Sequence, residues 1–249
     1  MKKKNGNRKK INHISFIKIY LKLYISYILY MNNILKDIKI MRKKKNAPVD
    51  LYGAYTFFDK NINPKIARYH VLIALILSSQ SKDETTNKIM TKLVNYGLTI
   101  DNIKKTKKED LYKIIRESGI AKKKASYIKK TTEILSSQYN NDIPNNFKDL
   151  IKLSGVGPKI AILTMNVAWN KNCGISVDTH VHRVSNRIGL VKTKTPNKTR
   201  EKLEELIPKK QWKNINPLLV GFGQQICTPR NPKCDTCKIN KKCKFYNDW

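Results

Sequence analysis

The chain has 249 residues and carries 51 Lys and Arg residues against 18 Asp and Glu residues, a formal net charge of +33. This length allows one domain of ordinary size or two small ones, and the charge indicates a polyanionic partner, with nucleic acid favoured over an acidic membrane surface. Four of the five cysteines lie close together near the C-terminus, which is unlike the disulfide framework of a secreted domain.

Residues 1–45 form a basic, low-complexity N-terminal extension with 14 Lys and Arg residues and a single acidic residue, Asp37. Its most apolar piece, residues 23–31, is too short to cross a bilayer, so we expect no membrane partner. A basic start, an apolar middle and almost no acid resemble an organelle-targeting segment. A disordered basic arm, or a nuclear import signal at residues 42–45, would explain the same composition.

From Ala47 onwards the patterns are helical. Residues 68–80 are apolar nearly all round, which predicts a buried helix. Thr106 to Glu109 has the form of a capping box, and Gly119 would end the helix that follows it. Further helices are predicted over residues 122–138, 146–153, 158–169, 178–188, 195–208 and 216–227. Strand-like alternation is missing throughout, so the sequence predicts an all-α fold.

The segment Leu153-Ser154-Gly155-Val156-Gly157-Pro158-Lys159 joins two of these helices. Gly155 and Gly157 allow a turn that other residues would strain, and Pro158 suits the first position of the new helix. The backbone N–H groups at such a helix start form a site for a phosphate. Gly155, Val156 and Gly157 are therefore predicted to bind the nucleic-acid backbone without reading its sequence.

Two residues after this hairpin are candidates for catalysis. Lys159 lies one residue into the new helix, where the positive end of the helix dipole favours the neutral, nucleophilic amine. Asp178 follows the extended apolar segment 174–177 and precedes a helix, which predicts an N-cap. Taken singly, each has a plain explanation as a solvated cation or a capping carboxylate, so the pair gains weight only from its context.

The cysteine array is spaced Cys-x6-Cys-x2-Cys-x5-Cys, and its members are Cys227, Cys234, Cys237 and Cys243. Four thiolates that converge on one centre suit either zinc or a [4Fe–4S] cluster. Structural zinc usually shows two Cys-x2-Cys pairs, and the single pair here counts against it. Cys173 lies outside the array and is interpreted as a small apolar residue.

The string Leu-x-Gly-Val-Gly-x-Lys, followed by Val-Asp-Thr-His-Val-x-Arg, resembles the helix–hairpin–helix DNA glycosylases, and the endonuclease III family most closely. The cysteine spacing resembles the iron–sulfur loop of that family, and the resemblance covers roughly residues 47–243. It implies that Lys159 attacks the sugar, that Asp178 assists, and that the four array cysteines bind a [4Fe–4S] cluster. It also adds His180 and Arg183 to the predicted DNA-binding residues.

The resemblance implies two helical lobes with a DNA cleft between them. Residues 61–171 would form a six-helix barrel that contains the hairpin, and residues 46–60 would join residues 172–249 in an iron–sulfur cluster lobe. Gln80 would fill the gap left by an extruded nucleotide, while Ile120 would wedge the opposite strand. The plain alternatives are a helix-terminal amide for Gln80 and a core residue for Ile120.

The implied activity is that of a bifunctional DNA glycosylase and abasic-site lyase of base excision repair. Its substrate would be double-stranded DNA with oxidised pyrimidines or abasic sites, and the protein would act as a monomer in the nucleus or in a DNA-containing organelle. One alternative is a monofunctional glycosylase in which Asp178 activates water. Another is a non-catalytic helix–hairpin–helix protein that only binds DNA.

Overall fold

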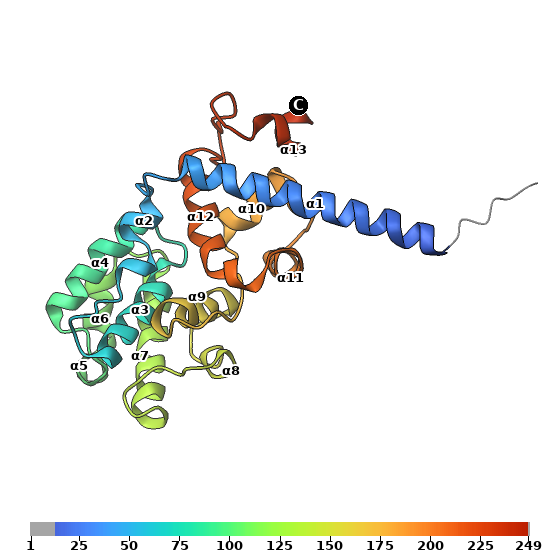
Figure 1. Cartoon of the computed structure of the whole chain (residues 1–249). Helices are drawn as coiled ribbons and strands as arrows, with labels where there is room; N and C mark the ends of the chain where they lie inside the picture. Colours follow the sequence, from blue (N-terminus) through green and yellow to red (C-terminus); the bar gives the residue numbers. More distant parts are fainter. Residues whose placement is uncertain (1–12, 249) are drawn as a thin grey trace, which may run out of the picture.

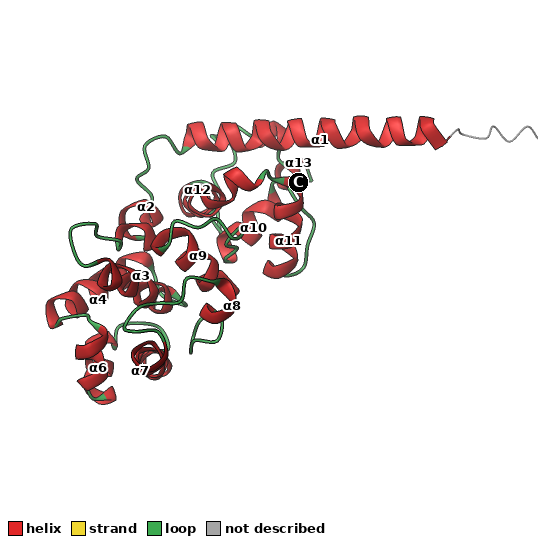
Figure 2. Ribbon diagram, turned by 60° about the horizontal axis from the view of Figure 1, so that its bottom comes forward, coloured by secondary structure: helices red, strands yellow, loops and turns green. Residues whose placement is uncertain are grey.

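The computed structural model describes residues 13–248, which fold into helices joined by short connections (Figure 1, Figure 2). The described part of the chain contains no β-strand, so the predicted all-α fold is confirmed. Within that part, no helix has both the length and the apolar character needed to span a membrane. The buried apolar residues gather in two separate clusters, as an arrangement of two lobes requires.

The first cluster is built around a central helix, α3, which begins at Pro64 and ends at Ser78. Residues 69–77 of α3 are all buried, as the all-round apolar pattern predicts. The helices that surround it are α4 (Asp83–Tyr96), α5 (Ile100–Lys105), α6 (Lys108–Ile115), α7 (Ala121–Gln138), α8 (Phe147–Leu150) and α9 (Pro158–Ala168). Of these, α9 packs most extensively on α3, which places the hairpin next to the best-buried helix of the protein.

The second cluster brings together residues from the start and the end of the region 47–243. Ala47 and Val49 pack with apolar residues between Ile175 and Cys243. The elements involved are α2 (Pro48–Tyr52), α10 (Thr179–Arg187), α11 (Pro196–Leu206) and α12 (Trp212–Gln225). Short helices complete the chain: η1 (Ala54–Thr56), η2 (Lys209–Gln211), η3 (Asn240–Lys242) and α13 (Lys244–Asn247).

The N-terminal extension differs from a disordered arm, because residues 13–41 form one long helix, α1 (His13–Met41). Met31, Ile34, Leu35 and Ile38 are buried in the second cluster, and their spacing of three and four residues makes one apolar face. The biased composition hides this stripe in the sequence. In contrast, the large apolar residues between positions 17 and 25 are exposed, and residues 1–12 of the extension lie outside the described residues.

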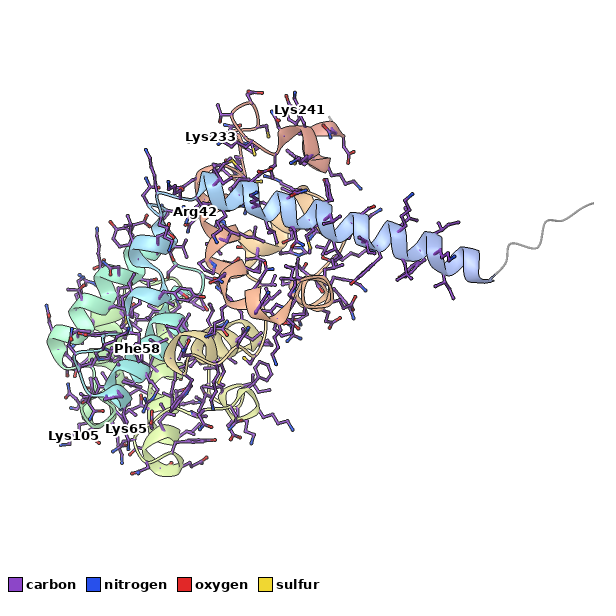
Figure 3. The ribbon with its side chains drawn as sticks, in the orientation of Figure 1. Arg42, Phe58, Lys65, Lys105, Lys233 and Lys241 are labelled. Atoms are coloured by element: carbon purple, nitrogen blue, oxygen red, sulfur yellow. The ribbon has the colours of Figure 1, made fainter. Side chains whose placement is uncertain are left out.

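Arg42 fixes the end of α1 to the second cluster (Figure 3). It is only 5% exposed, pairs with the Asp50 carboxylate, and donates a hydrogen bond of 2.8 Å to Oε1 of Gln225. A Cβ on Gly221 of α12 would lie 2.1 Å from the Arg42 guanidinium, so a side chain there would push Arg42 away from these partners. The basic run at residues 42–45 therefore offers only its last three lysines to a partner.

The predicted capping box at Thr106 is wrong. Thr106 ends α5 instead, where its hydroxyl donates a hydrogen bond of 2.8 Å to the carbonyl of Asn102. Helix α6 begins at Lys108, after Lys107, which forms no side-chain cap. The Thr106 hydroxyl lies between the end of α5 and the start of α6. The sequence pattern does not show whether it bonds a carbonyl of the preceding helix or an N–H of the following one.

The last long helix begins four residues earlier than predicted, at Trp212, so that Pro217 lies inside α12. A proline lacks the N–H that would bond the carbonyl four residues before it, which here belongs to Lys213. The hydroxyl of Tyr55 donates a hydrogen bond of 3.3 Å to that carbonyl. A partner from a distant segment thus compensates for the missing bond.

Candidate active site

The hairpin between α8 and α9 is held against α7. Gly155 has a φ of +79°, and a Cβ there would lie 2.7 Å from the Tyr127 ring, so only glycine fits. The Thr131 hydroxyl donates a hydrogen bond of 3.0 Å to the carbonyl of Ser154. These two contacts fix the turn from which α9 starts.

Gly157 is different from Gly155, and the strain argument made for it from the sequence is wrong. Its backbone is extended, with a φ of −92°, and an added Cβ would meet no atom within 4 Å. As the N-cap of α9 it supplies no side-chain capping bond, so the first N–H groups of the helix have no internal partner. The missing side chain leaves those N–H groups open to an anion.

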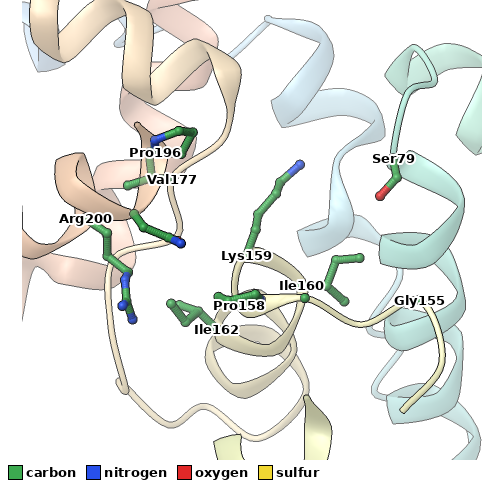
Figure 4. Close-up of a pocket in the computed structure, with 11 residues that line it drawn as sticks. Ser79, Gly155, Pro158, Lys159, Ile160, Ile162, Val177, Pro196 and Arg200 are labelled. Atoms are coloured by element: carbon green, nitrogen blue, oxygen red, sulfur yellow. The ribbon is translucent and has the colours of Figure 1, made fainter. Parts of the chain in front are cut away.

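Lys159 follows on the first turn of α9 and lines a cavity of about 310 Å³ (Figure 4). The walls come from both clusters, because Ser79 follows α3 while Val177, Asn197 and Arg200 belong to the second lobe. In Figure 4, Ser79 and Arg200 lie on opposite sides of Lys159. Sequence reasoning missed Ser79, Asn197 and Arg200, since no motif connects these separated positions.

Asp178 caps α10, as predicted, and its Oδ1 accepts a hydrogen bond of 2.8 Å from the N–H of Val181. The preceding segment is tied to the lysine helix, because the Ser176 hydroxyl donates a hydrogen bond of 3.2 Å to the carbonyl of Lys159. The carbonyl of Ser176 in turn accepts a bond of 3.0 Å from Nδ2 of Asn216 in α12. The two predicted catalytic residues therefore stand on a common, buried framework.

Other ionisable groups share this region. Burial lowers the pKa of His180, on which the charges of Asp178, Asp83 and Lys159 also act. Burial raises the pKa of Asp83, which accepts a hydrogen bond of 2.7 Å from Nε2 of Gln224. Asp83 begins α4 and resembles an ordinary first-turn acid in the sequence, so its place beside the site could not be predicted.

Arg183 forms hydrogen bonds within the protein, and its predicted contact with DNA stays a prediction. Its Nη2 donates hydrogen bonds of 3.0 Å to the carbonyls of Gly223 and Cys227 and lies 3.2 Å from Nδ1 of His180. Nη2 therefore joins α10 to the end of α12 and to the first cysteine of the array. The sequence motif alone does not reveal the partners of such a side chain.

Gln80 and Ile120 lie on neighbouring segments. Both have left-handed backbones, with φ values of 53° and 52°. The segments are in contact, because a Cβ on Gly119, the residue before Ile120, would lie 2.1 Å from the carbonyl oxygen of Gln80. Ile120 is 42% exposed, which rules out the alternative of a core residue. The structure therefore presents the two side chains close together at the surface.

The four cysteines of the array line one small cavity together with apolar side chains such as Ile188, Phe222 and Phe245. In the described part of the chain, no group of three or more His, Cys, Asp or Glu side chains is arranged to hold a metal ion. A [4Fe–4S] cluster takes one thiolate at each of four iron atoms, so its ligands surround a larger volume than a single ion does. The donor set and its apolar surroundings fit such a cluster.

Arg187 supports the cysteine loop from α10. Its Nη1 lies 4.0 Å from the Sγ of Cys227 and donates a hydrogen bond of 2.7 Å to the carbonyl of Thr228. Its guanidinium carbon lies 4.6 Å from the centre of the Phe245 ring. Lys233 and Lys241 surround the same loop (Figure 3), so the region combines buried thiols with a basic exterior.

An all-α fold with this hairpin, a lysine in a cavity between two lobes and a capping aspartate defines a helix–hairpin–helix DNA-repair protein. Residues 73–209 match the HhH-GPD superfamily of base excision DNA repair proteins. Endonuclease III-like protein 1 of Mus musculus is 48% identical over 216 residues, or 86% of this chain and 72% of its own length. Endonuclease III homolog 1, chloroplastic, of Arabidopsis thaliana is 42% identical over 221 residues, which cover 84% of this chain and 57% of that relative.

The solved structures agree. A trapped endonuclease III–DNA covalent intermediate matches with a TM-score of 0.77 and 27% identity, over 89% of this chain and 97% of the other. The chain belongs to the HhH-GPD superfamily and, within it, to the endonuclease III family. It is accordingly a base excision repair protein with DNA glycosylase function, which sets aside the alternative of a non-catalytic hairpin protein.

Proposed function

We propose that this protein is a bifunctional DNA glycosylase and abasic-site lyase that removes oxidised pyrimidines from double-stranded DNA. The observation that carries the proposal is the position of Lys159, in a cavity that both lobes line. A lysine that merely neutralised phosphate would serve equally well on an open surface. Its place in the cavity, beside the framework that holds Asp178, favours contact with a sugar instead.

DNA binding would begin at the backbone. The open N–H groups at the start of α9, next to Gly155, Val156 and Gly157, would hold a phosphate, and the net charge of +33 would attract the duplex. Extrusion of the damaged nucleotide costs on the order of a few kcal/mol, because its stacking and pairing are lost. Gln80 would fill the vacated space and Ile120 would wedge the opposite strand, which offsets part of that cost. We propose that the protein binds as a monomer.

The chemistry would then use two residues. The amine of Lys159 attacks C1′ of the sugar, the C1′–N bond breaks, and the base leaves with the bonding electrons. Asp178 assists with Oδ2, since Oδ1 is engaged by the N–H of Val181. It accepts a proton from the amine or stabilises positive charge on the sugar. The C1′–O4′ bond then breaks, O4′ takes a proton, and the opened sugar is a Schiff base with Lys159. This Schiff base acidifies the C2′ proton, and loss of that proton expels the 3′ phosphate by β-elimination, which cuts the strand on the 3′ side.

We propose that Cys227, Cys234, Cys237 and Cys243 hold a [4Fe–4S] cluster, whose main contribution would be to fix the basic loop in shape. The observation in favour is that all four thiols face one apolar cavity. Freshly purified protein should then be brown, with broad visible absorbance that Cys237→Ala removes. A colourless protein that contains zinc would contradict this assignment.

The activity is tested with duplexes that contain thymine glycol, 5-hydroxycytosine or an abasic site. Wild-type protein should cut all three, and Lys159→Ala should cut none. Lys152→Ala is a matched control, because Lys152 lies in the same hairpin but is exposed and paired with Asp149 at 2.7 Å. Strand cleavage by Lys159→Ala would contradict the covalent step at Lys159. Base release by wild-type protein without strand cleavage would instead favour a monofunctional glycosylase in which Asp178 activates water.

We also propose that the protein serves nuclear DNA, organelle DNA, or both. Relatives in Arabidopsis thaliana are named chloroplastic, which fits a targeting role for the extension. The packing of α1 limits that role: Tyr27 donates a hydrogen bond to the carbonyl of Leu190, and burial begins at Met31. A cleavable leader would have to end before Tyr27 to leave the second cluster intact.

A further inference from the structure

Lys124 is a buried lysine for which the proposed chemistry has no role. It lies in the first turn of α7 with 1% of its surface exposed, and burial lowers its pKa to about 8. Its Nζ donates hydrogen bonds to the carbonyl of Leu77 (2.6 Å), to Oγ of Ser118 (2.6 Å) and to Oγ of Ser81 (3.0 Å). All three acceptors are neutral. Because a buried charge without a carboxylate partner is costly, its position indicates a specific role.

The acceptors come from two segments that are distant in the sequence. Leu77 and Ser81 flank Gln80, while Ser118 lies two residues before Ile120. The segments also touch directly, since Oγ of Ser81 accepts a hydrogen bond of 3.0 Å from the N–H of Gly119 and lies 3.1 Å from Oγ of Ser118. Lys124 is thus bonded to both sides of the junction between the segments.

The tips of these segments need such support. Gln80 and Ile120 both have left-handed backbones, which side chains other than glycine disfavour and which is rare for a β-branched residue such as isoleucine. A backbone of this kind persists only when its surroundings hold it in place. Both tips are exposed, so the support comes from beneath, where Lys124 forms its three bonds.

We propose that Lys124 is a positioning residue that sets the spacing between Gln80 and Ile120, the two side chains that would enter the duplex. This inference rests on the function proposed above. It implies that Lys124 matters where a base must be extruded from a duplex, because filling and wedging offset the cost of that step. An abasic site in single-stranded DNA has neither a base to extrude nor an opposite strand to wedge.

The test compares Lys124→Met with a control on the same helix. Lys129 also donates to three oxygens, the carbonyls of Ile103 (3.0 Å), Lys104 (2.8 Å) and Thr106 (2.8 Å), but none of them lies in the two segments. Single-turnover rates are measured on a thymine glycol duplex and on a single-stranded abasic site. For Lys124→Met the ratio of duplex to single-strand rate should fall by about 10- to 100-fold, the scale of a small misplacement, while Lys129→Met should leave it unchanged.

A spectroscopic signal separates positioning from general loss of stability. With 2-aminopurine opposite the lesion, the rise in fluorescence on binding should be smaller for Lys124→Met than for wild type and Lys129→Met. An unchanged rate ratio in Lys124→Met, or an equal fall in Lys129→Met, would overturn the inference. If circular dichroism shows that Lys124→Met does not fold, Ser118→Ala takes its place with a smaller effect in the same direction. If wild type cuts neither substrate, the proposed function itself fails.

Discussion

The buried hydroxyl of Ser176 donates a hydrogen bond of 3.2 Å to the backbone carbonyl of Lys159. Ser176 lies two residues before Asp178, so this bond joins the approach to the aspartate with the first turn of the lysine helix. Asn216 extends the connection to α12 through its bond of 3.0 Å to the carbonyl of Ser176. The relative position of lysine and aspartate thus depends on a serine that carries no charge.

Ser176→Ala should therefore affect catalysis more than stability. Loss of one buried hydrogen bond should lower the free energy of unfolding by about 1 kcal/mol, whereas a small shift of Lys159 should slow incision by roughly tenfold or more. The comparison is Ser137→Ala, because the exposed Ser137 hydroxyl bonds carbonyls of its own helix, those of Glu133 and Ile134. An incision rate equal to wild type would show that the bond does not position the lysine.

The two hairpin glycines should respond differently to alanine. Gly155→Ala forces a left-handed alanine against the Tyr127 ring and should cost about 1–3 kcal/mol of stability. Gly157→Ala meets no neighbouring atom, so it should fold normally but weaken DNA binding by obstructing the phosphate. Urea unfolding and fluorescence anisotropy on an abasic duplex measure the two effects. Equal stability losses would contradict the distinction drawn between the glycines.

Much of this site could be predicted because its residues lie in local patterns. The left-handed turn at Gly155, Pro158 as the first residue of α9 and Asp178 as the cap of α10 each follow from a few neighbouring residues. Ser176 and Asn216 could not be predicted, since an isolated serine or asparagine carries no signal that it will bond the carbonyl of a distant segment. The bond from Arg183 to the carbonyl of Cys227 could not be predicted either, for the same reason.

The fold also has parts that the sequence predicts and parts that it does not. The all-α class and the buried helix α3 follow from apolar periodicity, whereas α1 does not, because its face of Met31, Ile34, Leu35 and Ile38 lies in a segment of biased composition. The start of α12 was also unpredictable, since Pro217 normally marks a helix start. Tyr55, from a distant segment, supplies the compensating bond to the carbonyl of Lys213.

Truncation tests the role of α1. Removal of residues 1–25 deletes side chains that are all exposed where the structure describes them, at positions 17–25. The midpoint temperature of thermal unfolding should therefore stay unchanged. Removal of residues 1–41 also deletes the four buried residues, each worth about 1.5–3 kcal/mol when fully buried, and should cause severe loss of stability. Two truncated proteins with the same midpoint would show that α1 does not belong to the second cluster.

His70 should make stability depend on pH. Its ring is buried, with Nε2 2.9 Å from the carbonyl of Leu98, and burial lowers its pKa from the ordinary 6.5. The unfolded chain therefore binds a proton at a higher pH than the folded chain does. Stability should be full above about pH 6.5 and fall as the pH drops below it, by roughly 1.4 kcal/mol for each unit of pKa difference.

His70→Gln should make this decline shallower in urea unfolding measured between pH 5 and 8. Part of the decline should remain, because burial lowers the pKa of His180 as well. A decline of the same steepness in the variant would show that His70 is not the source.

The most direct test of the central claim is reductive trapping. Wild-type protein is mixed with an abasic-site duplex and sodium borohydride, and the covalent product is digested and mapped by mass spectrometry. The account predicts a stable protein–DNA adduct whose DNA remnant is attached to Lys159, and no adduct with Lys159→Ala. Absence of an adduct from active wild-type protein, or an adduct on another residue, would contradict it.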